Sequence, residues 1–196
     1  MKKIFLVLLI FLGAATILMI SMSRATLEVM KRDEREGRLR VIPIFVGDMM
    51  VYKIPETNML PSNMFYVIKE MRDWLWTEFS NGDEREIKTL IVLADKKISE
   101  AKTLSERKKY GLALKAGMKA IDKLKYANGL VSEMKNQSSL QKQLFIQIRD
   151  ATLAYEEIVK GIGRNSGVEN REYLLLQKNI NDFKEEQIKK EMERAE

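Results

Sequence analysis

The 196-residue sequence contains no cysteine and no histidine. The lack of cysteine excludes disulfide bonds, thiolate metal sites and thiol nucleophiles. The lack of histidine removes the most common general base and the usual zinc ligand, together with every Ser-His and Cys-His catalytic pair. The sequence therefore favours a protein that is not an enzyme and holds no cofactor.

Proline and glycine are also scarce, with three and ten residues respectively. Long stretches rich in Leu, Ile, Lys, Glu and Ala lie between them, and this composition favours long helices over sheet. We expect an all-α fold with three parts. These are an N-terminal transmembrane or signal helix, a short extended or hairpin segment, and an up-and-down bundle of about five helices.

The charged residues are mixed in sign along the chain. Lysine and arginine number 34 and aspartate and glutamate 28, which leaves a net charge of +6. A nucleic-acid footprint would instead gather Lys and Arg on one element. We therefore expect solvated helix faces and no nucleic-acid partner.

Residues 1–23 form the strongest pattern in the sequence. After Lys2 and Lys3, no charge occurs before Arg24, and a helix over these twenty uncharged residues is about 30 Å long, the thickness of a bilayer core. The segment has no polar face, so we predict that it lies in the lipid bilayer as a single-pass signal or membrane segment. The side chains assigned to lipid are Ile4, Phe5, Leu6, Leu9, Phe11, Leu12, Ile17, Leu18 and Ile20.

Cleavage and orientation of this segment each have two interpretations. Ser23 and Ala25 form a small-x-small pattern that favours cleavage after Ala25, whereas the length of the apolar run favours an uncleaved anchor, which we expect. A count of Lys and Arg places the large domain inside the cell. The very short basic tail before the apolar run is instead typical of an export signal. We expect the helical domain on the extracytoplasmic side, at the cell surface or in the periplasm.

Residues 24–60 are predicted to form a charged helical stalk that ends near Gly37, followed by an extended linker. In "VIPIFVGDMMVYKIPE", two β-prone runs flank Gly47 and Asp48, a pair that suits a hairpin turn. Pro43 limits the first run to an edge. Because a lone hairpin is marginal in water, the alternative is an extended apolar arm lying on the helices.

Residues 61–196 show helical periodicity in five segments, which predicts one helical domain. The second segment has a narrow apolar seam that includes Ile87, Ile91, Ala94, Ile98 and Leu104, and the third and fourth have similar seams. A predicted turn, "GIGRNSG" at 161–167, separates the fourth segment from the last. It lacks the strand and the GKS or GKT ending of a phosphate-binding loop.

The first of these segments, residues 61–79, carries two tryptophans within three residues. Met64, Ile68, Met71, Leu75 and Phe79 recur at helical spacing, and Val67 and Trp74 widen the same stripe, so we expect this face in the core. Phe65 and Trp76 lie on a different side. We predict that they form an exposed aromatic patch that contacts a partner protein.

Two resemblances apply to this region. Residues 94–121 resemble one helix pair of the tetratricopeptide kind, but no second copy occurs near the 34-residue period that such arrays need. Residues 51–190 are similar to a family of exported or membrane-anchored bacterial helical domains without an assigned activity. The residues that carry this similarity are Leu60, Pro61, Ser62, Tyr66, Lys69, Ala94, Glu100, Ala101, Ala113 and Ala120. The resemblance implies a helical fold and an envelope location.

The sequence thus predicts a non-enzymatic, membrane-anchored extracytoplasmic domain that is a structural or protein-interaction module of the bacterial envelope. Its partners would be the lipid bilayer and a protein whose identity the sequence does not specify. The alternative is an envelope sensor or binding protein that holds a peptide, metal or small ligand between helices. For a metal, Met49 and Met50 with Met59 are the place outside the core where thioethers for copper(I) gather.

Overall fold

The structure of the chain is a computed structural model. It describes residues 41–57, 60–61, 66–78, 80, 83–134, 139–166 and 171–195, together with Gly13 and Ile17. Both isolated residues are helical. Apart from Ile17, the side chains assigned above to the lipid bilayer lie outside the described residues, as does Phe65. In the part of the chain that is described, no helix has the length and apolarity needed to cross a bilayer.

The predicted hairpin is confirmed. Strand β1 (Val41–Val46) pairs antiparallel with β2 (Met49–Pro55), with Ile44 opposite Tyr52 and a bulge between Ile44 and Phe45. The turn depends on Gly47, whose φ of +61° is a conformation that glycine adopts without strain. The hairpin also lies on the helices, against α3 and α5, which is how this marginal two-stranded unit gains its stability.

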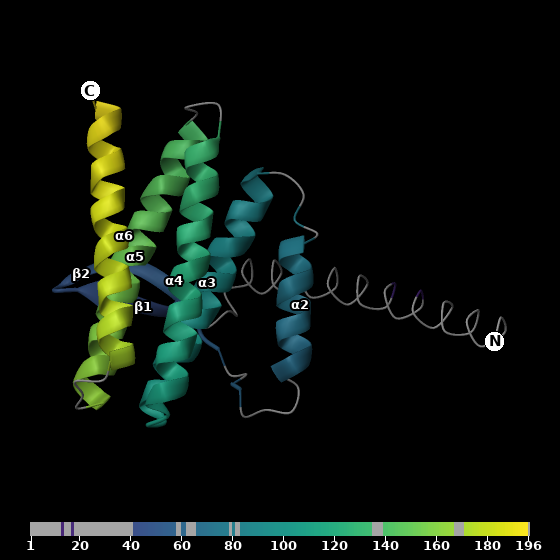
Figure 1. Cartoon of the computed structure of the whole chain (residues 1–196), viewed down its shortest axis with the longest axis vertical. Helices are drawn as coiled ribbons and strands as arrows, with labels where there is room; N and C mark the ends of the chain where they lie inside the picture. The colour runs from purple at the N-terminus through teal and green to yellow at the C-terminus, as the bar shows by residue number, and fades with distance from the viewer. Residues whose placement is uncertain are drawn as a thin grey trace.

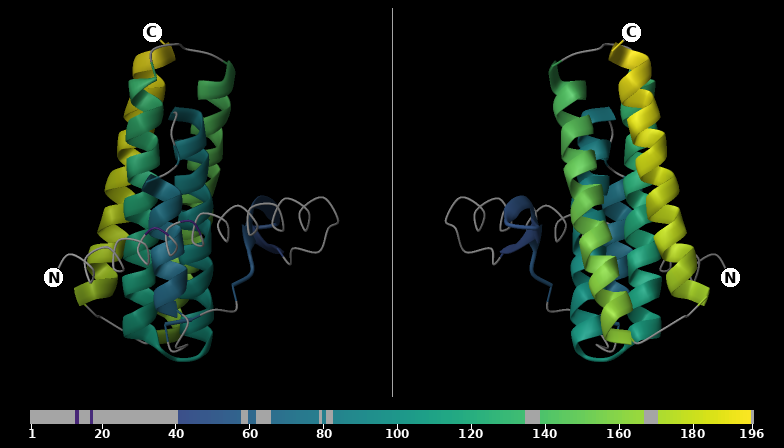
Figure 2. Two further views of the ribbon diagram at one scale, coloured as in Figure 1. Left: turned by 90° about the vertical axis from the view of Figure 1, so that its right-hand side faces the viewer. Right: turned by 90° about the vertical axis from the view of Figure 1, so that its left-hand side faces the viewer.

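Five helices follow the hairpin in the described part of the chain, as expected. They are α2 (Tyr66–Glu78), α3 (Asp83–Glu106), α4 (Tyr110–Glu133), α5 (Ser139–Ser166) and α6 (Arg171–Ala195). Helices α3 to α6 run up and down beside one another, while α2 stands at the margin next to α3 (Figure 1). The hairpin and α2 lie on different sides of the bundle (Figure 2).

The core lies between α3, α4, α5 and α6, where the predicted seams meet. The seam residues of α3 are all buried, and α4 faces them with small residues such as Ala113 and Ala120, which have no exposed surface. Small side chains let the two helix backbones approach closely, and burial of the larger aliphatic groups stabilises the bundle by about 25 cal/mol per Å² of apolar surface. Ile44 and Ile54 of the hairpin extend this core.

One predicted boundary is wrong. Residues 161–166 were expected to form a turn, but α5 continues to Ser166. Gly163 is needed for packing rather than for a turn, because a Cβ atom there would lie 2.3–2.6 Å from ring carbons and the hydroxyl oxygen of Tyr173 on α6. The glycine-rich sequence therefore marks a close contact between α5 and α6.

Candidate functional site

Helix α2 is amphipathic, but the face that it buries is its polar one. The predicted core stripe is exposed: Val67, Ile68 and Met71 are 64%, 53% and 45% exposed, and Leu75 is half-buried. Met64 and Phe79 lie outside the described residues. The buried residues of the helix are instead Lys69, Asp73 and Trp76. The prediction that the apolar stripe enters the core is therefore wrong.

The burial of the two tryptophans is the reverse of what the sequence predicted. Trp76, predicted at the rim, is 8% exposed, whereas Trp74, predicted inside, is 62% exposed. The Trp76 ring lies between two cations, with the Arg72 guanidinium carbon 5.1 Å and Lys96 Nζ 4.5 Å from its centroid. Such contacts over an indole are attractive and strengthen on desolvation. Trp76 is therefore the buried anchor of α2 and not a free aromatic patch.

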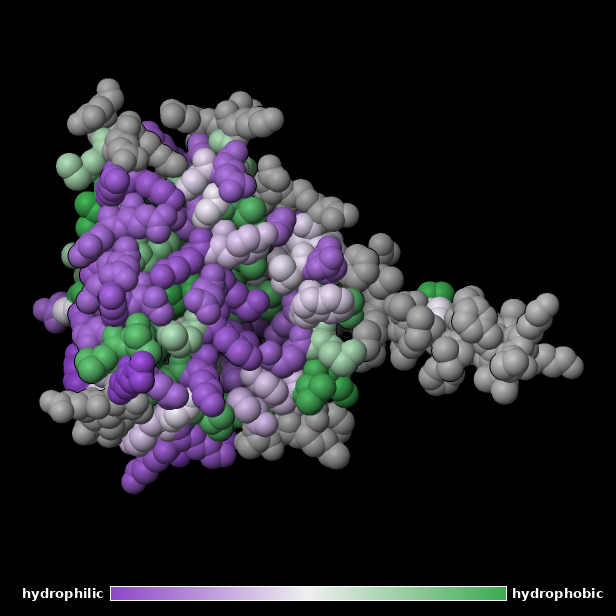
Figure 3. Space-filling view, viewed as in Figure 1, coloured by the Kyte–Doolittle hydropathy of each residue, from purple (hydrophilic) through white to green (hydrophobic). Residues whose placement is uncertain are grey.

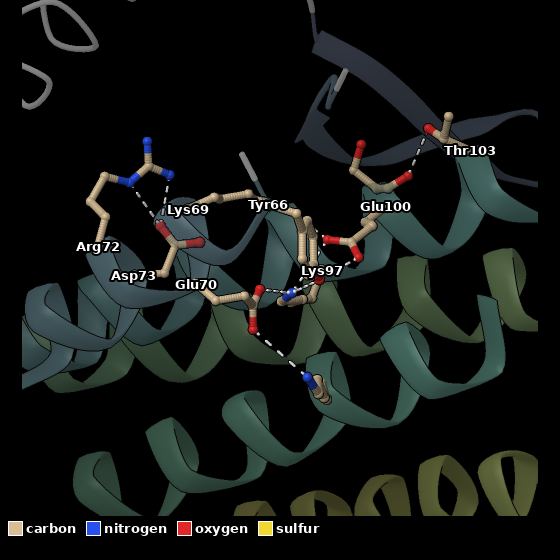
Figure 4. A network of polar contacts seen from close by, with 10 residues as sticks. Tyr66, Lys69, Glu70, Arg72, Asp73, Lys97, Glu100 and Thr103 are labelled. Carbon is tan, nitrogen blue, oxygen red and sulfur yellow. Dashed lines mark hydrogen bonds and ion pairs between the residues drawn. The ribbon is translucent and has the colours of Figure 1, made fainter. Parts of the chain in front are cut away.

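A cluster of buried charges holds the polar face of α2 on α3 (Figure 4). Lys69 Nζ lies 3.0 Å from Glu100 Oε2, and the Tyr66 hydroxyl donates to Glu100 Oε1 at 2.7 Å. Lys97 donates to the Tyr66 hydroxyl at 2.7 Å and forms ion pairs with Glu70 and Glu100. Two ammonium and two carboxylate groups thus balance one another, with Lys69, Lys97 and Glu100 buried and Glu70 partly exposed.

The pKa values in this cluster reflect burial and pairing. Burial opposes ionisation of Glu70, but the hydrogen bond and the charge of Lys97 outweigh it, so the pKa of Glu70 is lowered. Burial, followed by the hydrogen bond to Glu100, raises the pKa of Tyr66. Burial lowers the pKa of Lys96 to about 8, with Asp73 opposing this shift. A buried ion pair seldom adds net stability compared with an apolar contact. The cluster therefore determines the orientation of α2 on α3 more than the free energy of its docking.

The outward face of α2 is consequently a continuous apolar stripe formed by Val67, Ile68, Met71 and Trp74, which we call the α2 stripe. These positions follow one another at helical spacing along one side of the helix. Figure 3 shows hydrophobic residues among the polar ones on the side of the molecule where α2 lies. A soluble helix normally turns such a stripe inward, so its exposure marks an interaction surface.

A groove of about 440 Å³ lies beside the α2 stripe, between α2, α3 and α4. Trp74 forms part of its wall, Leu93 and Lys97 come from α3, and Lys119 and Lys123 come from α4. Burial lowers the pKa of Lys123, as do the charges of Lys97 and Lys119. The groove is therefore a mixed, partly desolvated surface next to an exposed aromatic ring.

The fold and this surface define an antiparallel helical bundle that carries one helix docked through its polar side. The family described as "Domain of unknown function (DUF5667)" matches residues 58–194, and the chain belongs to this family. No curated protein and no solved structure matches the chain.

The residues that carried the family resemblance have clear structural roles. Tyr66, Lys69 and Glu100 meet in the buried charge cluster, although 31 residues separate Lys69 from Glu100 in sequence. Ala94, Ala101, Ala113 and Ala120 line the contact between α3 and α4 and have no exposed surface. The sequence therefore singled out Tyr66, Lys69 and Glu100, but only as residues that carry the family resemblance and not as side chains that contact one another.

Proposed function

We propose that this protein is a non-enzymatic, membrane-anchored interaction module of the bacterial envelope, and that the α2 stripe is the surface that binds its protein partner. The observation that carries the proposal is the inverted docking of α2. Exposure of four large apolar side chains on one side of a helix is unfavourable in water unless another surface covers them. The uncharged segment 4–23 supports the membrane anchor, and the short basic tail before it, which is typical of an export signal, supports an extracytoplasmic position.

The partner surface that fits best is an apolar helix of another protein. The α2 stripe presents Val67, Met71 and Trp74 at the i, i+4 and i+7 spacing that helix-on-helix recognition uses. Its edges carry Glu70 and Glu78 as well as Arg72. An amphipathic helix that lies on a membrane surface carries mainly Lys and Arg on its polar side. The mixed charges here favour a protein partner over a lipid surface.

Site-specific photo-crosslinking of the full chain in its own membrane tests this proposal. A photoreactive amino acid replaces Met71, and as a control it replaces Leu174, which is similarly exposed on α6. We expect an adduct with a different protein from position 71 only. The adduct should disappear in Ile68→Glu and persist in Leu175→Glu, an equivalent change on α6. A lipid adduct alone, or equal capture from position 174, would contradict the proposal.

A topology reporter tests the membrane part separately. Fused after Glu196, it should behave as extracytoplasmic. Cytoplasmic behaviour would contradict the proposed orientation. Release of the unprocessed chain from membranes without detergent would contradict the anchor itself.

The groove between α2, α3 and α4 favours a second candidate function, in which the domain binds a ligand between helices. Its lining carries both signs of charge, since Glu70, Asp73, Glu78 and Asp122 face the groove together with Lys97, Lys119 and Lys123, which suits a ligand that itself carries both charges. A tetrapeptide with free amino and carboxyl ends, whose carboxylate would pair with Lys123, should then raise the melting temperature of the full chain. The rise should be absent in Lys123→Gln and present in Lys115→Gln, which lies on the same helix outside the groove.

A further inference from the structure

A buried carboxyl group joins the hairpin to the bundle where β2, α3 and α5 meet. Asp95 of α3 is 7% exposed. The Tyr155 hydroxyl of α5 donates a hydrogen bond to Asp95 Oδ1 at 2.7 Å, and the Tyr52 hydroxyl of β2 donates one to Asp95 Oδ2 at 3.2 Å. Each carboxyl oxygen is thus bound by a different element. These three side chains, which we call the Asp95 cluster, connect the hairpin to the helices.

Asp95 has no compensating cation: within the described residues it forms no ion pair, and no lysine or arginine shifts its pKa. Strand β1 has no ionisable residue, and α4 packs on α3 through alanine and leucine side chains. From α5, Asp150 and Gln147 lie near Tyr52, and Asp150 adds a further negative charge on that side.

The surroundings disfavour the ionised form of the carboxyl group. Burial raises the pKa of Asp95 from 3.8 to about 7, and the hydrogen bonds from Tyr155 and Tyr52 oppose this shift without cancelling it. Burial, followed by the charge of Asp95, raises the pKa of both tyrosines. Of the three groups, only Asp95 therefore changes its charge near neutral pH.

We propose that the Asp95 cluster is a proton-operated latch, which holds the hairpin on the bundle while Asp95 is protonated and loosens the hairpin when Asp95 is ionised. When Asp95 is protonated, its hydroxyl can donate to the oxygen of one tyrosine while its carbonyl oxygen accepts from the other, so both contacts persist without a buried charge. A carboxylate loses much more hydration free energy on burial than a neutral carboxyl group does, and separation of the hairpin restores that hydration. The latch does not depend on what the α2 stripe binds.

Opening of the latch has a defined structural consequence. The hairpin would withdraw Ile54, which has no exposed surface, and Ile44 from the core. It would also open the cleft of about 330 Å³ that Ile44 and Phe45 form with Ile158 and Ile162 of α5. A rise in pH would thereby expose apolar surface on a side of the bundle that α2 does not cover.

The size of the effect follows from the difference between the pKa of Asp95 in the docked state, about 7, and its ordinary value of 3.8. The docked hairpin is favoured by proton binding, so its stability is greatest below pH 3.8 and declines as the pH rises to about 7. If Asp95 is hydrated in the open state, the opening equilibrium constant increases on the order of 100-fold between pH 5 and pH 8.

Hydrogen exchange of the full chain in detergent micelles measures this equilibrium. Because an undocked two-stranded hairpin is marginal, the protection of the Val41–Pro55 amides, corrected for the intrinsic exchange rate, reports docking. We expect that protection to fall on the order of 100-fold from pH 5 to pH 8, while the amides of α4 change little. Asp95→Asn should remove the pH dependence. Asp122→Asn, which alters an exposed carboxylate on α4, should retain it.

Carbon-13 NMR titration of the Asp95 carboxyl group in the wild-type chain provides a second measurement, which decides the question even where Asp95→Asn does not fold. A midpoint near 7 supports the latch. A midpoint near 4, a hairpin whose protection is the same at pH 5 and pH 8, or an unchanged pH dependence in folded Asp95→Asn would each overturn it.

Discussion

The two tryptophans of α2 provide a matched test of how this helix is docked. Trp76 is 8% exposed and lies between the Arg72 and Lys96 side chains, whereas Trp74 is 62% exposed two residues earlier on the same helix. Replacement of either residue by alanine removes the same atoms. The two substitutions should therefore differ only through their environment.

The magnitude for Trp76→Ala follows from its contacts. Truncation of a buried tryptophan costs about 3–5 kcal/mol, and each of the two cation–π contacts adds roughly 0.5–1 kcal/mol. Against this, Trp76 Nε1 is buried without a hydrogen-bond partner among the described residues, and removal of such a group recovers about 1–3 kcal/mol of desolvation cost. We expect a net loss of about 3 kcal/mol in the docking free energy of α2. For Trp74→Ala the expected change is within about 0.5 kcal/mol.

Hydrogen exchange is the appropriate assay, because α2 can open without the rest of the bundle. Within the described residues, α2 packs against α3 alone, apart from the ion pair between Glu70 and Lys119 at 3.7 Å. The protection of the Tyr66–Glu78 amides should fall on the order of 100-fold in Trp76→Ala and change by about twofold at most in Trp74→Ala. Amides in α4 and α5 serve as the internal reference in both variants.

Two results would refute this reasoning. Equal loss of α2 protection in both variants would mean that Trp74 is as well packed as Trp76. Unchanged protection in Trp76→Ala would mean that the charge cluster alone docks the helix. The first result would make the orientation of α2, and with it the exposure of the α2 stripe, incorrect. The second would leave the orientation unchanged and would show that Trp76 is not the anchor of α2.

Three further predictions concern other parts of the fold. Glu100→Gln removes the carboxylate that Lys69 and Lys97 share, although Lys97 keeps its ion pair with Glu70. It should lower the stability of α2 docking by about 3–5 kcal/mol, seen as loss of α2 amide protection. Gly163→Ala should lower the free energy of unfolding, measured by denaturant titration, by about 1–3 kcal/mol, because the new methyl group clashes with the Tyr173 side chain. Gly161→Ala is the control: a Cβ atom there meets no neighbour within 4 Å, so the same titration should show a rise of up to about 1 kcal/mol. Wild-type stability should decrease from pH 5 to pH 8 by a few kcal/mol as Asp95 ionises, since about 1.4 kcal/mol accompanies each pKa unit, and urea unfolding of Asp95→Asn should lack this dependence.

Much of the bundle was predictable because its seams are unambiguous. In α3, α4 and α5, the apolar residues occupy one narrow side and charged residues occupy the rest, so only one side can face the core. The seam of α3 from Ile87 to Leu104 is buried as predicted. The hairpin was also predictable, because Gly47 and Asp48 separate two β-prone runs at the spacing of a tight turn.

Helix α2 was not predictable from its own sequence, because the partners of its polar face are on α3. Lys69 and Glu70 looked like solvated charges, and so did Lys97 and Glu100, since nothing local indicates that they neutralise one another. Once these charges pair, the helix is oriented by its polar side, and its apolar stripe faces outward. Helical periodicity considers one helix at a time, so it selected the wrong face of α2 as buried. It therefore predicted Trp74 to be buried and Trp76 to be exposed, the reverse of the structure.

The amino-acid sequence by itself determined the helical class, the number of helices in the described region, the seams of α3 to α5 and the hairpin turn. Each of these depends on periodicity or on local backbone preference. Only the tertiary structure decided which side of α2 is buried and that Asp95 lies between Tyr52 and Tyr155. These features depend on charges and hydrogen bonds between residues that are 31 to 60 positions apart in the chain, and a local pattern contains no information about such distant partners.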